Sequence, residues 1–439
     1  MTGSIALARG ARQRIALAAG VVLLFAGCAY SLTSGTTLNQ VKVDKVEQGI
    51  QEIRQLNFVK PVPVVVKSRD EAEHQMEADL MRDYTDAQLH ADGVAGTLVG
   101  LYPPGMDLKT ASLKLLRNQV AGFYDLHSRE MVLVSGGTDL GFFMNATEFV
   151  AQRDVGGEMV LAHEFTHALQ DQHFDLDKKL DEVKNSDDRA IALKCVAEGD
   201  ATLAGYAYVA GRMDQSVASA LLSHLSDIAS SFTSQAPGTP EGLSEPLIFQ
   251  YSDGVRFVAE AYKRGGWSGV DKLYATPPLS SHQIIHPADY FDHRTLPLEV
   301  SVQGYEQTLP TWKKVDDDTF GELLLRIILE RSVGQTAPEI ALAQRWAGDQ
   351  MIILQSHEDI SAIWMIVFAD AATASKFAAV YATALDRIPA NRHQVESRDR
   401  AVLVVVGAAV QSMGSLAPAV WAASKIDGHA AAWIAHESR

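Results

Sequence analysis

The stretch Met159–Leu169, Met-Val-Leu-Ala-His-Glu-Phe-Thr-His-Ala-Leu, decides how this part of the chain folds and what chemistry it can carry. It contains no proline and one carboxylate, so we expect a helix. On a helix, His163 and His167 lie on one face, one turn apart, and their imidazoles can bind one Zn²⁺ at about 2.0–2.1 Å. Glu164 points roughly 100° around the helix, where it can take a proton from a water held by the metal. The alternative is an exposed helix with two idle histidines.

A catalytic zinc has three protein ligands, and the third is predicted to be Glu198. A glutamate on an apolar helical face is poorly solvated, so it needs an ion partner or a metal. Gly199 costs a helix about 1 kcal/mol relative to alanine, which the close approach of a second helix would justify. Two alternatives stay open: a buried Glu198 paired with a basic residue, and Cys195 as a rival ligand. On a helix, the neighbours of Glu198 at three, four and seven positions are all small or apolar, with the exception of Lys194. They are Ile191, Lys194, Cys195, Ala201, Thr202 and Gly205.

The start of the chain is typical of an export signal. Three arginines precede an apolar run, residues 15–26, that is too short to span a bilayer comfortably. The small residues before Cys28 resemble the lipobox of bacterial lipoproteins. We therefore expect a lipoprotein signal peptide over residues 1–27, a lipid on Cys28 and a tether over 28–60. The alternative is an uncleaved, short N-terminal anchor. Either way the body is exported, and lipidation predicts a membrane-anchored protein of the cell envelope, facing the periplasm or the cell exterior.

Composition narrows the possible partners. The 439 residues carry a net charge of −16 and contain 47% hydrophobic residues, so a core can form, whereas binding to nucleic acid is not expected. The only cysteines are Cys28 and Cys195. If Cys28 carries lipid there is no disulfide, and Cys195 is expected to be a small buried residue of a helix.

Two further regions have clear patterns. Residues 120–134 predict a β-hairpin whose turn is at 125–129, just upstream of the histidine helix. From about residue 318 the pattern changes, and we expect a compact α+β domain. Its predicted elements are helices at 320–331 and 371–385 and strands at 350–354, 361–368 and 401–406.

The motif with its downstream glutamate resembles the gluzincin group of metallopeptidases. More closely, the chain resembles an uncharacterised bacterial family of exported zinc peptidases, from about residue 95 to 349. The resemblance implies a zincin-like catalytic domain over 61–310, with its active-site helix beside a small sheet. With the C-terminal α+β domain that the pattern predicts over 311–439, the expected fold class is α+β. The resemblance rests on Gly122-Phe123-Tyr124-Asp125, the residues from His163 to Leu176, Glu198-Gly199-Asp200-Ala201 and Gln283-Ile284-Ile285-His286-Pro287.

The sequence thus predicts a zinc peptidase that acts on a protein or peptide substrate. His163, His167 and Glu198 are the expected metal ligands and Glu164 the expected general base. The mechanism also needs a donor for the oxyanion, and Tyr251 and His286 are candidates that the sequence does not rank. The alternative is a non-catalytic, zinc-binding envelope lipoprotein that binds protein partners.

Overall fold

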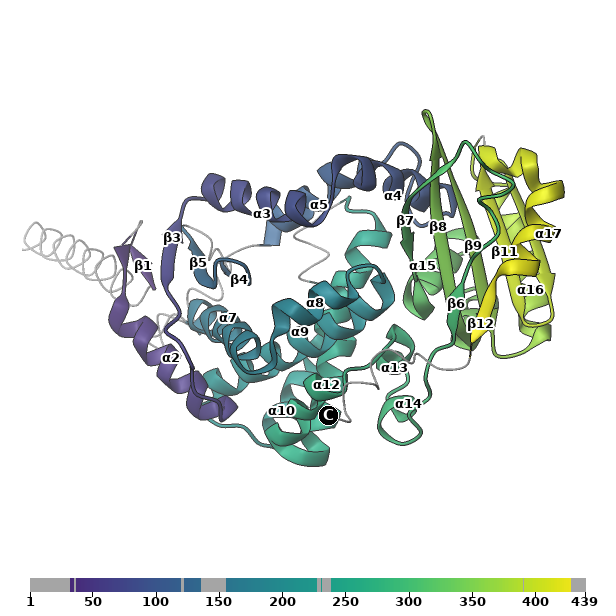
Figure 1. Cartoon of the computed structure of the whole chain (residues 1–439). Helices are drawn as coiled ribbons and strands as arrows, with labels where there is room; N and C mark the ends of the chain where they lie inside the picture. The colour runs from purple at the N-terminus through teal and green to yellow at the C-terminus, as the bar shows by residue number, and fades with distance from the viewer. Residues whose placement is uncertain are drawn as a thin grey trace, which may run out of the picture. The chain divides into compact units, whose positions relative to one another are not determined.

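The computed structural model describes residues 32–34, 37–119, 122–135, 155–226, 230, 238–389 and 391–427. Over these residues the fold is mixed α+β, which confirms the predicted class (Figure 1). The chain divides into two compact units. The first takes its described residues from Met1–Ala72, Val120–His173 and Ala204–Val217, and the second from Glu73–Gln119, Phe174–Leu203 and Ala218–Arg439.

The first unit contains a helix where the sequence predicts a tether. Helix α2 (Gln40–Arg54) carries Val43, Val46 and Ile50 at the three- and four-residue spacing of a helical face, and all three are buried. The tether predicted for 28–60 is therefore wrong over α2, because this apolar face packs into the folded unit. Cys28 and the predicted signal peptide lie outside the described residues.

A small sheet and one long helix complete the first unit. The strand order is β3-β5-β4, with β3 parallel to β5 and β4 antiparallel to it. The pair β4 and β5 is the predicted hairpin, which is confirmed, and α7 lies beside it (Figure 1). The bounds are β1 Thr33–Ser34, β2 Thr37–Leu38, β3 Val64–Lys67, β4 Gly122–Asp125, β5 Glu130–Val134 and α7 Val155–Phe174.

A five-stranded antiparallel sheet organises the C-terminal part of the second unit, in the order β10-β11-β9-β8-β7. Its elements confirm the predicted helices and strands of this region. A separate pair, β6 and β12, is also antiparallel. The strands are β6 Glu299–Ser301, β7 Lys313–Asp318, β8 Trp346–Ser356, β9 Asp359–Phe368, β10 His393–Arg398, β11 Ala401–Gly407 and β12 Lys425–Asp427.

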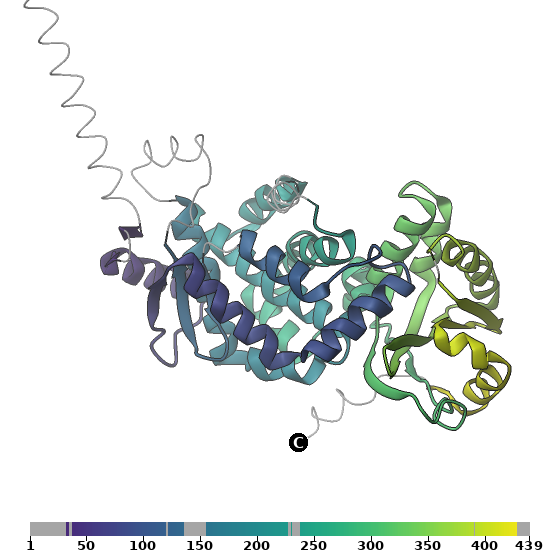
Figure 2. The ribbon, with the colours of Figure 1, turned by 90° about the horizontal axis from the view of Figure 1, so that it is seen from above.

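Helices cover both faces of this sheet. On one face, Ile363 and Leu403 share an apolar core with Leu416 of α17. On the other, Trp364 packs against Phe320, which precedes α15, and against Tyr381 of α16. Figure 2 shows the sheet with α15 and α16 on one side and α17 (yellow) on the other. The alternation of apolar side chains along β8, β9 and β11 thus supplies two cores.

The remaining helices include α9, which begins in the second unit and ends in the first, and α12 of the second unit. Helix α12 is kinked at Gly265 and Gly266, which have non-helical backbone angles. None of the described helices has both the length and the apolar character needed to cross a lipid bilayer. The bounds are α3 Arg69–Asp83, α4 Asp86–Leu98, α5 Leu108–Gln119, α8 Leu176–Val183, α9 Asp187–Ala210, α10 Gln215–Ser223, α12 Glu241–Ala275, α13 Ser281–Ile285, α14 Ala288–Phe291, α15 Gly321–Val333, η1 Pro338–Arg345, α16 Ala371–Leu385, η2 Ala408–Ser412 and α17 Met413–Ala423.

Glycines allow α9 and α12 to approach closely. A Cβ added to Gly199 would lie 2.4 Å from the carbonyl oxygen of Gly254, and one added to Gly254 would lie 2.6 Å from that of Cys195. The prediction that Gly199 marks a close helix contact is therefore confirmed. Cys195 is fully buried at this contact, as expected, and burial raises the pKa of its thiol.

Candidate metal centre

In the central part of helix α7, the residues that are not fully buried are the candidate metal ligands and the candidate base. From Leu161 to Asp171, the half-buried residues are His163, Glu164 and His167, and every other residue is buried. A helix packed on nearly all sides loses its amphipathic pattern, so the exposed face is narrow. The three half-buried side chains of this stretch are therefore all polar.

The two histidines are spaced for a shared metal ion. Their Nε2 atoms are 3.1 Å apart. Ligands of a tetrahedral ion bound at 2.0–2.1 Å lie about 3.3 Å from one another, so a shift of a few tenths of an ångström would fit one. Nδ1 of His167 lies 2.9 Å from Oε1 of Gln170, which can accept a hydrogen bond from that nitrogen and leave Nε2 free to bind a metal. The sequence analysis missed Gln170, although its position one turn after His167 is a usable signal.

Glu198 is placed by the continuity of α9. This helix runs unbroken from Asp187 to Ala210, and at its end, inside the first unit, Gly205 packs on α7. A Cβ on Gly205 would lie 3.5 Å from the backbone nitrogen of His163. Glu198 precedes Gly205 by about two turns and so shares its face. His163, His167 and Glu198 are one of the side-chain groups that could hold a metal ion, and the donor set of two imidazoles and a carboxylate suits Zn²⁺.

Glu164 is held against the small sheet. Its Oε2 accepts a hydrogen bond of 2.8 Å from the backbone N–H of Tyr124. Tyr124 lies on β4, the outer strand of the described three-stranded sheet, and its phenol donates to Asp171 at 3.2 Å. Two residues of α7 about two turns apart, Glu164 and Asp171, therefore bond to an edge strand, where an extended peptide can pair.

The other predicted site residues lie in the second unit. Tyr251 is half-buried on α12, and no observation tests its role as oxyanion donor, which stays a prediction. His286 follows α13, and its Nε2 lies 3.1 Å from Oε2 of Glu322. Glu322 also contacts His282, so the structure gives His286 two partners that the sequence analysis did not connect with it.

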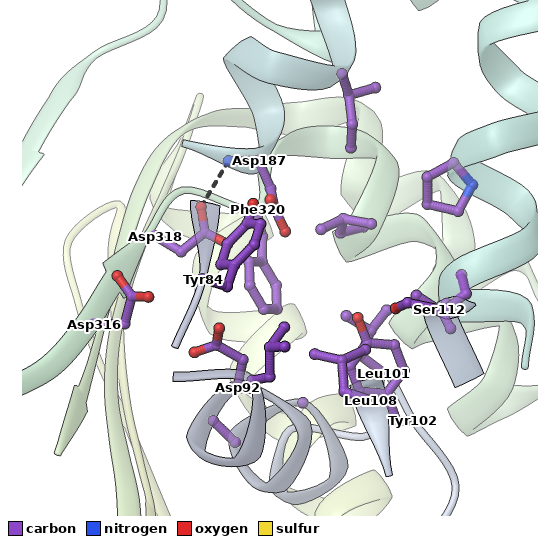
Figure 3. Close-up of a pocket in the computed structure, with 18 of the residues that line it drawn as sticks. Tyr84, Asp92, Leu101, Tyr102, Leu108, Ser112, Asp187, Asp316, Asp318 and Phe320 are labelled. Carbon is purple, nitrogen blue, oxygen red and sulfur yellow. Dashed lines mark hydrogen bonds between the residues drawn. The ribbon is translucent and has the colours of Figure 1, made fainter. Parts of the chain in front are cut away.

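A pocket of about 320 Å³ in the second unit gathers acidic and aromatic side chains. Figure 3 shows the carboxylates of Asp92, Asp316 and Asp318 around it, with Tyr84 and Phe320 between them. The backbone N–H of Asp187 donates to Asp318 at 2.7 Å (Figure 3). Burial, together with the nearby carboxylates, raises the pKa of Asp92 to about 8. Acids crowded away from water retain protons, so this pocket differs chemically from the histidine clusters.

Comparison with known proteins gives one match. Residues 307–418 match the family model described as "Domain of unknown function (DUF8575)". This segment begins after α7, α9 and α13 and contains all five strands of the five-stranded sheet. No curated protein and no solved structure matches the chain.

Proposed function

We propose that the chain is a zinc-dependent peptidase in which His163, His167 and Glu198 bind the metal and Glu164 is the general base. The observation that carries the proposal is the pair of Nε2 atoms 3.1 Å apart on the exposed face of α7, beside Glu164. When bound, Zn²⁺ polarises a carbonyl oxygen and lowers the pKa of its water to about 7. These are the two requirements of peptide hydrolysis at neutral pH.

The residues of the chain supply orientation and proton transfer. The N–H of Tyr124 fixes one carboxylate oxygen of Glu164, so this side chain loses little entropy when it accepts a proton from the attacking water. Glu164 then delivers that proton to the leaving amine. The edge of β4 can hold the substrate in an extended conformation through main-chain hydrogen bonds. The substrate class is therefore a protein or peptide.

We further propose that the mature chain is anchored in the cell envelope through a lipid on Cys28. The support is the sequence of the export signal alone. Replacing Cys28 with serine should release the chain from the membrane fraction and abolish labelling by a radioactive fatty acid. Retained labelling of the Cys28→Ser variant would contradict the anchor.

Metal analysis tests the ligand set directly. We expect the full chain, purified in detergent, to cleave members of a peptide library, to lose this activity with a chelator and to regain it with Zn²⁺. His163→Ala should lose both the activity and the zinc bound on α7. His173→Ala is the matched control, because His173 lies on the same helix but is exposed. Cleavage by a folded His163→Ala variant would contradict the proposal.

A further inference from the structure

A second pair of histidines four residues apart lies in the second unit, apart from the pair on α7. His282 on α13 and His286 at its end both face Glu322, in the first turn of α15. Nδ1 of His282 lies 2.5 Å from Oε2 of Glu322, and Nε2 of His286 lies 3.1 and 3.2 Å from its two oxygens. Glu322 is 1% exposed. A buried carboxylate thus meets two imidazoles within hydrogen-bond distance.

We propose that His282, His286 and Glu322 form a second site for a divalent metal ion of the Zn²⁺ type. The donor set is two imidazole nitrogens and a carboxylate, and one donor atom from each residue lies within 4.8 Å of the others. Tetrahedral coordination needs separations of about 3.3 Å. The distances of 3.1 and 3.2 Å between His286 and Glu322 are close to this value, whereas Nδ1 of His282, at 2.5 Å, has to move away from Glu322 to admit an ion. Nε2 of His282 lies 3.2 Å from Asp289, a carboxylate placed to accept the proton of the ring nitrogen that does not bind the metal.

The positions of the acceptors identify what competes with the metal. Each ring nitrogen of His282 faces a carboxylate, Glu322 on one side and Asp289 on the other. A neutral imidazole carries one N–H and cannot donate to both. The two contacts therefore need a further proton, on the ring or on one of the carboxyl groups, or a metal ion bound by His282 and Glu322. The proposal is that Zn²⁺ displaces this proton.

The frame around the cluster is held by buried hydrogen bonds. Ser281 donates its backbone N–H to Asp188 at 2.8 Å, and its Oγ accepts from the N–H of Leu323 at 3.1 Å. This serine joins α9, α13 and α15 next to both His282 and Glu322. Asp349 accepts hydrogen bonds from the N–H groups of Phe320 and Gly321, both 3.0 Å, which fixes the start of α15. Ligands held in this way need little rearrangement to bind a metal.

The cluster opens on a cavity but lacks a base. His282, His286 and Asp289 line a cavity of about 480 Å³ together with Arg345 and Trp346, so a water or an anionic group can reach a metal there. Gln283 follows the first histidine where the other motif has Glu164. Its Oε1 accepts from the N–H of Leu279 and its Nε2 donates to Thr295, both at 2.7 Å. The proposed metal therefore joins α13 to α15 and binds ligands, without Glu-assisted hydrolysis.

Zinc stoichiometry of the full chain tests this proposal independently of the peptidase activity. We expect two zinc ions per chain in the wild type and in Glu164→Gln. One should remain in a His163→Ala/His167→Ala double variant, and none in that variant with His286→Gln added. The matched control adds His293→Ala instead, because His293 is an exposed neighbour outside the cluster. A folded double variant that binds no Zn²⁺ overturns the proposal.

Affinity provides a second measurement that does not require removal of a ligand. In the double variant, Asp289→Asn should weaken Zn²⁺ binding about 10- to 100-fold, the usual effect of changing a carboxylate that orients a ligating histidine. Asp292→Asn, at an exposed acid three residues away, should leave binding unchanged. Circular dichroism verifies folding in each case. Equal zinc affinity of the Asp289→Asn and Asp292→Asn chains would refute the role of Asp289 and the geometry of the site.

Discussion

The clusters on α7 and α13 share a histidine spacing but differ in the residue after the first histidine. Glu164 follows His163 and is half-buried at the opening of α7. Gln283 follows His282, is 1% exposed and bonds to the backbone on both sides. The two clusters thus share a pair of imidazoles beside a glutamate and differ in whether a second carboxylate next to the pair is available to act as a base.

The clusters are similar in how they obtain their third ligand. In each proposed site a glutamate comes from another helix, and the glycine next to that glutamate lets its helix pack closely on a further element. Gly199 follows Glu198 and touches α12, and Gly321 precedes Glu322 and touches Asp188. The side-chain chemistry of both sites thus depends on backbone contacts that exclude a Cβ.

The largest expected effect separates metal binding from catalysis. Glu164→Gln should lower the peptidase rate by about 10²–10⁴-fold, the usual contribution of a general base. Glutamine keeps the shape of the side chain, so the zinc content should not change. Rates measured on a peptide substrate, with zinc content measured on the same samples, check this. A Glu164→Gln variant that retains the wild-type rate would contradict the role of Glu164 as general base, which is the proposed functional difference between the two clusters.

The next effect concerns the start of α15. Gly321 has φ +72°, and a Cβ there would overlap the carboxylate of Asp188. Gly321→Ala should therefore lower the free energy of unfolding by about 3 kcal/mol, through backbone strain and overpacking together. Gly334→Ala is the matched control, because φ is +96° there and nothing lies within 4 Å, so only the strain is present. Urea denaturation measures both, and equal losses would contradict the role of the Asp188 contact.

A smaller loss is expected where α9 meets α12. Gly199→Ala places a Cβ 2.4 Å from the carbonyl oxygen of Gly254, which should cost about 1–3 kcal/mol and displace the neighbouring Glu198. Zinc affinity at the α7 cluster should fall with it. Gly414→Ala in α17 has open space around it and should be neutral or stabilising. Thermal unfolding and zinc titration of both variants test this, and a neutral Gly199→Ala would refute the close contact.

The smallest effect concerns the acidic pocket, which has carboxylates without histidines. The pKa of Asp92 is raised from 3.8 to about 8 by burial, Asp316 and Asp187. Between these values the folded state holds a proton that the unfolded state has lost, so the stability contributed by Asp92 falls as pH rises from about 4 to about 8. Asp92→Asn should therefore be more stable relative to wild type at pH 8 than at pH 5. The effect is limited because Asp92 is only partly buried. Urea denaturation at several pH values measures it, and a difference that is constant with pH would contradict the shift.

The local spacing of apolar and polar residues predicted many of the helices and strands of this molecule. The helix around His163, the hairpin and the elements of the C-terminal domain follow from spacings within one element, and Gly199 revealed a helix contact. The prediction was wrong for α2, because the pattern of an export signal and tether hid a buried apolar face. It also missed Gln170, which can orient His167 only because the ring of His167 is turned so that Nδ1 lies next to the amide oxygen.

The sequence by itself determined that His163 and His167 share one helical face and that Glu164 lies about 100° around the helix from His163, because these angles follow from the helical period. It also determined the α+β class, through apolar periodicity. Only the tertiary structure brought Glu322 to His282 and His286 and gave Glu164 a partner on β4. Such contacts join residues about 40 positions apart in the sequence. They depend on how helices and strands pack, and packing leaves no local period in the sequence.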